Sequence, residues 1–391
     1  MPGHLAHVIG ARPNFIKAAP VIAALATRSV DQRLIHTGQH YDERMSDVFF
    51  ADLSLPVPDV NLNVGSGSHA EQTAAAMIGL EREFAADPPA LVIVYGDVNS
   101  TLAASLAAAK LGIPTAHVEA GLRSFDRSMP EEINRLVSDL LADLLFTTSP
   151  EAADHLAVMG VPPGRIHFVG NPMIDTLLAE RPRFDSVAQR ARLDLPQTYG
   201  VVTIHRPANV DGDTGARAIV AALDGVAALV PLVIPLHPRG RANLEAAGLR
   251  DGPRLRIVEP LGYIAFLSLV AGARLVLTDS GGIQEETTIL DVPCLTIRPN
   301  TERPITISHG TNRLVAPDEV VAATRDVLAG PVRPAGARPP LWDGHAGERI
   351  ADVIVAWLRD PAGRATPAAA SGTAATAVAP SAAASMPSGP R

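Results

Sequence analysis

The chain contains 391 residues, with a formal net charge of −8 and a single cysteine, Cys294. This length allows two domains with sizeable cores, while the acidic balance disfavours nucleic-acid binding and one cysteine excludes an intrachain disulfide or a cysteine-based zinc site. The sequence has neither a signal-peptide pattern nor an apolar segment long enough to cross a membrane, so we expect a cytoplasmic protein that does not bind membranes.

Short apolar runs alternate with longer helical patterns along the chain, in two successive series. The strands predicted in the first series are 5–9, 33–36, 91–95, 115–118, 144–147 and 166–169. Those in the second series are 201–204, 232–235, 255–258, 274–277 and 295–297, and helices are predicted between strands, for example at 101–111, 131–143 and 173–179. This alternation predicts an α/β protein with two doubly wound, Rossmann-like domains that face a cleft, with ligands beyond the carboxyl ends of the strands.

The domain boundary is predicted at the end of the first series, just before Pro172. The first domain would then span residues 1–171 and the second, the nucleotide-binding domain, residues 172–344. We expect a last helix at 345–359 to complete the first domain. Residues 364–391 are rich in Ala, Ser and Pro and have no periodic apolar face, which predicts a disordered tail.

The most informative segment is 275–286, where an apolar run ends in the small-residue turn Asp279–Gly282 and a helical pattern follows. Free backbone N–H groups at such a helix start can hold a phosphate. We expect Glu285 and Glu286 in the first helical turn, where they either bond a sugar hydroxyl or merely complement the helix dipole. A diphosphate joined to a ribose would satisfy the first interpretation.

Charged residues also follow strands in the first half of the chain. Arg12 and Lys17 come after the first strand and suit an anionic ligand. Asp97 follows another strand and is either a general base or, like Asn99 and Ser100, a helix cap, which is the more common use of such residues. His117 and Glu119 are two residues apart at a strand end, so we expect them on one face. A third metal ligand is not evident, so Glu119 is an acid–base candidate.

The segment 128–135 has the pattern of a helix start. Ser128 and Glu131 fit a capping box with Pro130 in the first turn, and Arg135 can pair with Glu131 one turn later, whereas Glu132 has no such explanation. In the second half, strands are followed by a histidine or an arginine at His205, Arg206, His237 and Arg303. His205 can carry a proton near neutral pH. Together these positions predict a charged ligand between the two domains.

Eight motifs carry a family resemblance, at residues 10–17, 37–40, 95–97, 117–123, 130–135, 205–207, 279–286 and 301–304. Together and in this order they resemble the non-hydrolysing UDP-N-acetylglucosamine 2-epimerases, over about residues 4–358. The resemblance implies a glycosyltransferase-B-like fold, a homodimer, UDP-N-acetylglucosamine and UDP as ligands, and no metal or other cofactor. The implied reaction is reversible conversion to UDP-N-acetylmannosamine, by elimination of UDP to 2-acetamidoglucal and its re-addition.

The resemblance also implies roles for individual residues. The catalytic candidates are Asp97, Glu119, Glu131 and His205, and we expect burial beside a diphosphate to raise the pKa values of these carboxylates. Glu286 would take the ribose hydroxyls, and Ser280 with the two glycine amides would take the diphosphate. The full set implied to hold UDP is Arg12, Lys17, His237, Ser280, Gly281, Gly282, Glu286 and Arg303. An allosteric site for a second substrate molecule would use Gln39, His40 and Arg206, although residues 41–42 and 65–69 depart from the best-known family pattern.

Three alternatives stay open. Some relatives act on more decorated di-acetamido sugars, and these commonly have tryptophan where this chain has Arg303, which favours the simpler sugar. A glycosyltransferase on the same fold would share the UDP site but need no proton exchange at C2. A protein that only binds nucleotide sugars would not need the four catalytic candidates together.

Overall fold

The computed structural model describes residues 3–39, 50, 52–53, 55–210, 213–236, 238–331 and 338–360. The predicted ligand-binding positions His40 and His237 and the predicted tail at 364–391 lie outside these ranges. Within them, no helix has both the length and the apolar character that crossing a membrane requires.

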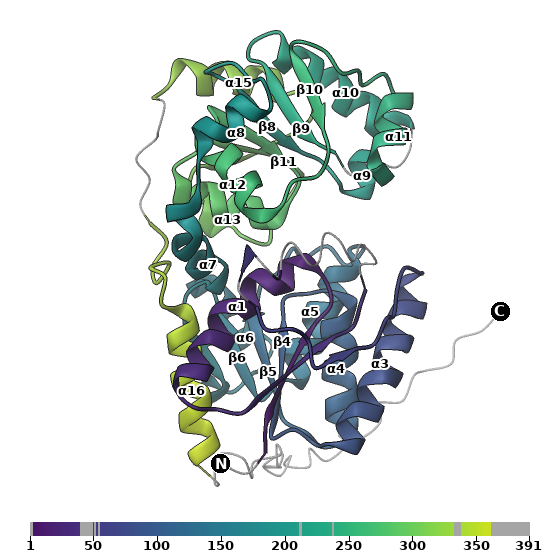
Figure 1. Cartoon of the computed structure of the whole chain (residues 1–391), viewed down its shortest axis with the longest axis vertical. Helices are drawn as coiled ribbons and strands as arrows, with labels where there is room; N and C mark the ends of the chain where they lie inside the picture. Colours follow the sequence, from purple (N-terminus) through teal and green to yellow (C-terminus); the bar gives the residue numbers. More distant parts are fainter. Residues whose placement is uncertain are drawn as a thin grey trace, which may run out of the picture.

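The described strands form two parallel sheets, one above the other in Figure 1. The first has the order β3-β2-β1-β4-β5-β6-β7, with β1 Leu5–Ile9, β2 Gln32–His36, β3 Val60–Asn61, β4 Leu91–Tyr95, β5 Thr115–Ala120, β6 Leu144–Thr147 and β7 Ile166–Phe168. The second has the order β10-β9-β8-β11-β12-β13, with β8 Gly200–Thr203, β9 Leu232–Pro235, β10 Leu255–Val258, β11 Leu275–Thr278, β12 Cys294–Ile297 and β13 Asn312–Val315. Each predicted strand is present with ends shifted by at most two residues, whereas β3 and β13 were not predicted.

Helices join the strands and pack against the sheets (Figure 1). In the first half these are α1 Arg12–Thr27, α3 His69–Ala86, α4 Asn99–Lys110, α5 Pro130–Leu141, α6 Pro150–Val158, α7 Pro172–Glu180 and α8 Ser186–Arg192. In the second half they are α9 Pro207–Val210, α10 Asp213–Ala227, α11 Pro238–Ala246, α12 Tyr263–Gly272, α13 Gly281–Leu290, α14 Ile305–Ser308, α15 Val320–Ala329 and α16 Ala346–Arg359. Short 3₁₀ helices cover Pro163–Arg165 and Arg181–Arg183.

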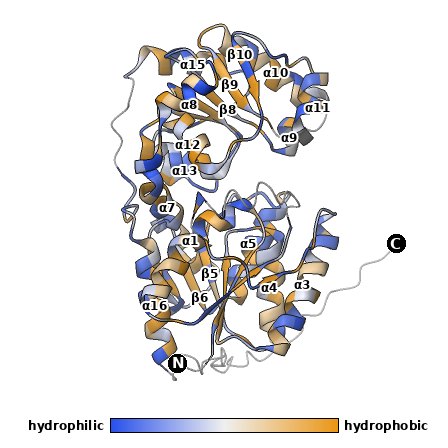
Figure 2. Cartoon of the chain, in the orientation of Figure 1, coloured by the Kyte–Doolittle hydropathy of each residue, from blue (hydrophilic) through white to orange (hydrophobic). Residues whose placement is uncertain are grey.

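The central strands are mostly apolar, as the orange colour in Figure 2 shows, because both of their faces are buried. Successive residues of β1 point to opposite faces. Leu5 and Ile9 belong to the core that contains residues of α1 and α16, whereas Ala6 and Val8 belong to the core under α3 and α4. This arrangement confirms the prediction of two doubly wound α/β domains with parallel sheets.

The last described helix, α16, returns from the second sheet to pack along α1 of the first domain (Figure 1). It buries Ile350, Ile354 and Leu358, and the carboxylate of Asp175 on α7 accepts the Gly347 N–H at 2.7 Å. We propose the domain division 1–171 with 345–359, and 172–344, and this return of the chain supports it.

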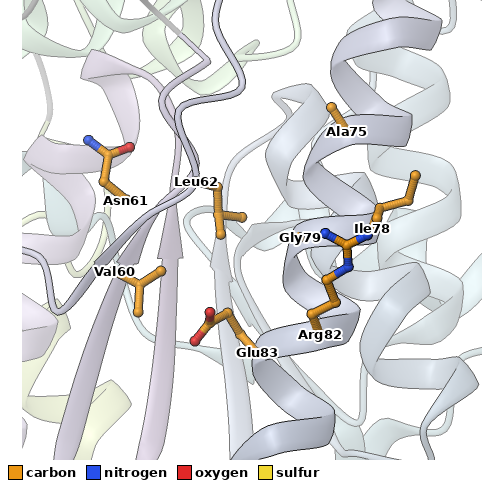
Figure 3. Close-up of a pocket in the computed structure, with 8 residues that line it drawn as sticks. All are labelled: Val60, Asn61, Leu62, Ala75, Ile78, Gly79, Arg82 and Glu83. Atoms are coloured by element: carbon orange, nitrogen blue, oxygen red, sulfur yellow. The ribbon is translucent and has the colours of Figure 1, made fainter.

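One hollow of about 470 Å³ lies at the β3 edge of the first sheet (Figure 3). Val60, Asn61 and Leu62 line one side, and Ala75, Ile78, Gly79, Arg82 and Glu83 of α3 line the other. None of these residues is among the predicted site residues, so the hollow is separate from the predicted ligand site.

Candidate active site at the domain boundary

The strand order of each sheet reverses at one point, between β1 and β4 in the first sheet and between β8 and β11 in the second. Ligands of doubly wound folds bind outside the strand ends at such points. Arg12 and Lys17 follow β1, and Asp97 follows β4. In the second sheet, His205 follows β8 and Ser280 follows β11. Predicted site residues therefore occupy both reversal points.

Glu119 lies at an irregularity of β5, where the register with β6 shifts between Val118 and Ala120. Its φ of 73° is in the left-handed region, a strained conformation for a residue with a side chain. The buried carboxylate pairs with Lys17 of α1, and its Oε1 accepts from Nη2 of Arg303 at 2.7 Å. Glu119 thus joins the two domains, while its sequence neighbour His117 bonds elsewhere.

The charge state of Glu119 follows from these contacts. Burial raises the pKa of Glu119, but the cations of Lys17 and Arg303 outweigh burial and hold the pKa below its ordinary value. The expected rise of this pKa beside a diphosphate stays a prediction, because the pKa below its ordinary value belongs to the ligand-free site. Glu119 is ionised at neutral pH and can accept a proton once a cation moves to another anion.

Asp97 pairs with Nη1 of Arg135 from α5, and its side chain is 26% exposed. Helix α4 begins at Asn99 and has no side-chain hydrogen bond at its N-cap. The capping interpretation of Asp97, Asn99 and Ser100 is therefore wrong, and Asp97 is left with an ion pair beside the site. A partly exposed carboxylate held by one arginine can exchange a proton with a ligand.

The start of α5 also differs from the prediction. The helix begins at Pro130 after Met129, without a side-chain capping bond, and the Ser128 hydroxyl donates to Asp126 at 2.6 Å instead. The capping box is therefore absent from this position. Glu131 is left half-buried in the first turn, where it acts electrostatically on Arg206 of the other domain.

Glu132, which the sequence left unexplained, has a structural role. Its carboxylate accepts the backbone N–H groups of Ser124 at 2.9 Å and Phe125 at 3.2 Å. It also pairs with Nη2 of Arg135 at 2.7 Å, the arginine that was expected to pair with Glu131. Glu132 therefore fixes both a loop and the arginine that holds Asp97.

His205 is oriented by Asp279, for which the sequence predicted no role. Asp279 is fully buried, and its Oδ1 lies 3.0 Å from Nδ1 of His205. The same carboxylate accepts the backbone N–H of His205 and of Arg206, and the side-chain amide of Asn209. The side chain of His205 is 62% exposed, so its other nitrogen is accessible. A carboxylate that fixes one imidazole nitrogen in this way sets the tautomer and direction of the other.

Arg303 is the centre of a buried charge cluster between the domains. Besides Glu119, its guanidinium lies 3.1 Å from Glu285 and 3.4 Å from Glu302, and these carboxylates raise the pKa of Arg303 although burial opposes them. Glu302 is held by Arg298 at 2.8 Å and by Arg206 at 3.3 Å. Buried charges need such partners because each would otherwise keep its full desolvation penalty.

Helix α13 presents the predicted N-terminus. It begins at Gly281, and the side chain of the N-cap Ser280 makes no capping bond to the helix. A Cβ added to Gly281 would lie 2.5 Å from Nη1 of Arg303, so only glycine leaves room for this guanidinium beside the helix start. Backbone donors and a buried cation are thus adjacent, as an anion site requires.

Glu285 and Glu286 lie in the second turn of α13, so their predicted place in the first turn is wrong. The interpretation that these two carboxylates complement the helix dipole is therefore also wrong, because that effect is confined to the first turn. Burial raises the pKa of Glu285 to about 7 and, together with the charge of Glu285, the pKa of Glu286 to about 8. Glu285 accepts from Asn171 at 3.0 Å, and Glu286 faces the Tyr263 hydroxyl.

The other predicted positions among the described residues are Arg12, Gln39 and Arg206. Arg12 is the first residue of α1 and is partly exposed. Gln39 is buried, where its Oε1 accepts the Ser100 hydroxyl at 2.8 Å. Arg206 reaches across the boundary to the Met129 sulfur at 3.6 Å. The cations, the carboxylates and the helix N-terminus therefore meet where an anionic ligand with an acid–base reaction would be held.

The chain is similar in sequence to known proteins of one family. The sequence profile of the UDP-N-acetylglucosamine 2-epimerase family matches residues 23–355. A UDP-N-acetylglucosamine 2-epimerase of Methanocaldococcus jannaschii is 39% identical over 90% of this chain and 98% of its own length. A UDP-2,3-diacetamido-2,3-dideoxy-D-glucuronate 2-epimerase of Pseudomonas aeruginosa is also 39% identical, over 89% of this chain and 98% of its own.

A solved structure extends the likeness to the fold. The crystal structure of the M. jannaschii UDP-GlcNAc 2-epimerase in complex with UDP-GlcNAc and UDP superimposes with a TM-score of 0.85, at 39% identity, over 90% of this chain and 99% of that one. The glycosyltransferase-B-like arrangement expected from the sequence is confirmed by this match. The chain therefore belongs to the UDP-N-acetylglucosamine 2-epimerase family.

Proposed function

We propose that the protein converts UDP-N-acetylglucosamine reversibly to UDP-N-acetylmannosamine. One observation carries the proposal: Asp97 at the reversal point of the first sheet and Glu119 on the neighbouring strand β5 belong to one domain, while His205 and the N-terminus of α13 lie at the reversal point of the other. The pair of Glu119 with Arg303 joins the two domains. Membership of the epimerase family supports the same substrate. Acid–base groups on one side and anion-binding groups on the other are what this reaction requires.

The hydrogen at C2 of the sugar is not acidic, because no carbonyl adjoins it in the ring. Direct deprotonation is therefore unfavourable, and we infer an elimination. A base removes the C2 proton, the C1=C2 double bond of 2-acetamidoglucal forms, and the C1–O bond breaks with both electrons leaving on UDP. In the return step a UDP oxygen attacks C1 while a proton is added to C2 from the opposite face.

The proton transfers on two faces need more than one acid–base group, and Asp97, Glu119, Glu131 and His205 are our candidates. Glu119 is ionised in the ligand-free site, as a base must be. His205, fixed by Asp279, has a largely exposed imidazole that can transfer a proton to or from a ligand.

Departing UDP gathers negative charge, so cations and backbone donors aimed at it stabilise the transition state. We propose that Arg12, Lys17, Arg303, Ser280, Gly281 and Gly282 bind the diphosphate and that Glu286 bonds the ribose. Lys17 and Arg303 pair with Glu119 in the ligand-free protein. When the diphosphate takes these cations, Glu119 loses its counter-charges and its proton affinity rises, which prepares it to hold the proton that it removes.

The same proposal includes a cytoplasmic homodimer without a cofactor, in which Gln39, His40 and Arg206 respond to a second substrate molecule. Sedimentation of the purified protein tests the dimer. A steeper than hyperbolic dependence of the rate on UDP-N-acetylglucosamine tests the activation, and a simple hyperbola would remove it.

A more decorated substrate is the second candidate, because the P. aeruginosa relative with that name is as similar to this chain as the archaeal one. NMR of each sugar nucleotide with the protein in D2O distinguishes the two. Deuterium at C2 of UDP-N-acetylglucosamine, with a growing manno product, supports our proposal. Exchange only in the UDP-diacetamido uronic acid would replace it, and UDP binding without exchange in either would favour a transferase or a binding protein.

A further inference from the structure

A second charged cluster contacts the turns next to the proposed catalytic carboxylates Asp97 and Glu119. His117 of β5 and Asp139 of α5 are both fully buried, and Nδ1 of His117 lies 2.7 Å from Oδ1 of Asp139. Nε2 of His117 lies 2.8 Å from the Gly96 carbonyl oxygen. Oδ2 of Asp139 accepts from Nη2 of Arg123 at 2.6 Å and from the Gly121 N–H at 3.1 Å. No step of the proposed reaction uses any of these side chains.

The hydrogen-bond partners of His117 determine which of its ring nitrogens carry a hydrogen. The Gly96 carbonyl can only accept. Burial raises the pKa of Asp139, but its bonds with His117 and Arg123 outweigh burial and hold the pKa below its ordinary value, so this carboxylate also accepts. A neutral imidazole has one N–H, and two acceptors therefore require that His117 carries a hydrogen on both nitrogens.

The pair bonds to both turns that carry the proposed catalytic carboxylates. Gly96 directly precedes Asp97, has a φ of 61°, and is held on its other side by an N–H bond to the Val118 carbonyl at 2.9 Å. A Cβ at Gly96 would lie 3.0 Å from the Glu119 carboxylate, so the backbone of this turn also packs closely against Glu119. Gly121, two residues after the strained Glu119, is fixed by Asp139.

We propose that His117 and Asp139 are positioning residues that hold the Asp97 and Glu119 turns in register with each other. The proposal rests on the proposed function in that Asp97 and Glu119 are taken as the acid–base groups. The pair touches the turns and not the substrate, so it acts on where the carboxylates lie. A displacement of about 1 Å in such groups lowers turnover on the order of 100-fold.

Three variants separate geometry from charge. In Asp139→Asn, the new amide N–H₂ can donate to a neutral His117 while its oxygen still accepts from Gly121 and Arg123, so both turns stay held without the charges. In His117→Gln, the amide donates to Gly96 and its oxygen then faces the Asp139 carboxylate, acceptor against acceptor. The double variant H117Q/D139N turns that repulsion into a hydrogen bond and restores the link between the turns.

His7→Gln is the matched control. His7 is also fully buried in a central strand and also has two side-chain partners, with Nδ1 at 2.7 Å from the Tyr95 hydroxyl and Nε2 at 2.8 Å from Gln32. It contacts neither Gly96 nor Gly121. A loss that reflects only a disturbed core would therefore be shared by both histidine variants.

We expect H117Q to lower kcat on the order of 100-fold, with UDP affinity and KM nearly unchanged. D139N and H7Q should each stay within a few-fold of the unsubstituted protein, and H117Q/D139N should recover most of the loss. Equal kcat in folded H117Q and H7Q overturns the proposal, as does D139N that is as impaired as H117Q. If H117Q fails to fold, the double variant carries the test: it should match D139N, and a 100-fold deficit against D139N overturns the proposal.

A readout without turnover keeps this proposal distinct from the proposed function. In ¹⁵N–¹H spectra of histidine side chains, His117 should show two N–H signals in the unsubstituted protein and one in D139N, whether or not the sugar is epimerised. A single N–H signal in the unsubstituted protein overturns the assignment of the pair. Absence of C2 exchange with two N–H signals would instead count against the proposed reaction alone.

Discussion

The Arg303 guanidinium donates to the Glu119 carboxylate across the domain boundary, with 2.7 Å between Nη2 and Oε1. Both side chains are buried, and the pair connects a strained residue of β5 with the loop that precedes α14. The contact gives Arg303 two proposed roles in one site. It sets the charge state of a proposed base, and it lies where the departing diphosphate is proposed to bind. Each role can be tested by a substitution.

Arg303→Met should move the acidic limb of the pH profile of kcat/KM to higher pH. Removal of the cation raises the pKa of Glu119 in the free enzyme, so a higher pH is needed to ionise it. The activity at every pH should also fall, because UDP loses a partner. Arg33→Met, which breaks the partly exposed pair with Glu83 on the far edge of the sheet, is the control. An acidic limb that stays in place in R303M would show that Glu119 is not the group that this limb reports.

Asp97→Asn should lower turnover roughly 10²- to 10⁴-fold, the usual size of a general acid–base contribution. UDP affinity should change little, since Asp97 pairs with Arg135 and not with the residues proposed to hold UDP. Rates of C2 deuteration and calorimetric binding of UDP are the two measurements. Asp87→Asn, an exposed carboxylate at the end of α3, provides the comparison. Unchanged deuteration in D97N would remove Asp97 from the mechanism.

Asp279→Asn should lower kcat on the order of 100-fold, since a histidine held in the wrong tautomer loses its acid–base role. The amide would present N–H₂ toward Nδ1 of His205, which the carboxylate now bonds at 3.0 Å. Asp185→Asn removes a charge from a carboxylate that caps α8 and should leave kcat unchanged. If D279N and H205N, combined in one chain, multiply their effects in full, the two residues act independently and this account of His205 fails.

The unfolding free energy should decrease as pH rises from about 4.5 toward 8, partly because of Glu286. Below this window the carboxyl is protonated in both states. Within it the unfolded chain releases the proton while the folded protein retains it, since burial raises the folded pKa of Glu286 to about 8. Glu286→Gln should flatten the decrease, which urea titrations at several pH values would measure. Glu81→Gln at an exposed position is the control, and equal slopes in E286Q and the unsubstituted protein would contradict the pKa.

The sequence predicts the strands and the site location well because both depend on local pattern. Apolar runs such as Leu91–Tyr95 have few alternatives to a buried strand, and parallel strands bring their carboxyl ends together whatever the details. Motif residues such as Arg12, Asp97, His205 and Ser280 therefore fall at the two reversal points. Local pattern does not show the partner of each charge. For Asp97 it left both a general base and a helix cap open, because Arg135 lies 38 residues away.

The features that the sequence did not reveal at Glu119, Glu132 and Asp279 have the same cause. The register shift at Glu119 depends on the pairing of β5 with β6, and the residues His117–Ala120 alone do not predict it. Glu132 was unexplained because the loop that it holds is not helical, and Asp279 because the residues that it orients are 70 to 74 positions away. Signals for these roles exist only in contacts between distant segments.

Helix α16 has a consequence for how the protein is made. It is translated after both sheets, yet its apolar residues Ile350, Ile354 and Leu358 pack in the core with α1, which is translated before the second domain. The first domain therefore cannot finish folding on the ribosome until the whole second domain has been synthesised, and in the meantime the α1 face is exposed to other apolar surfaces. A stop codon before Ala346 would leave the second domain's strands intact and still yield an aggregating chain, with the defect at the opposite end from the truncation.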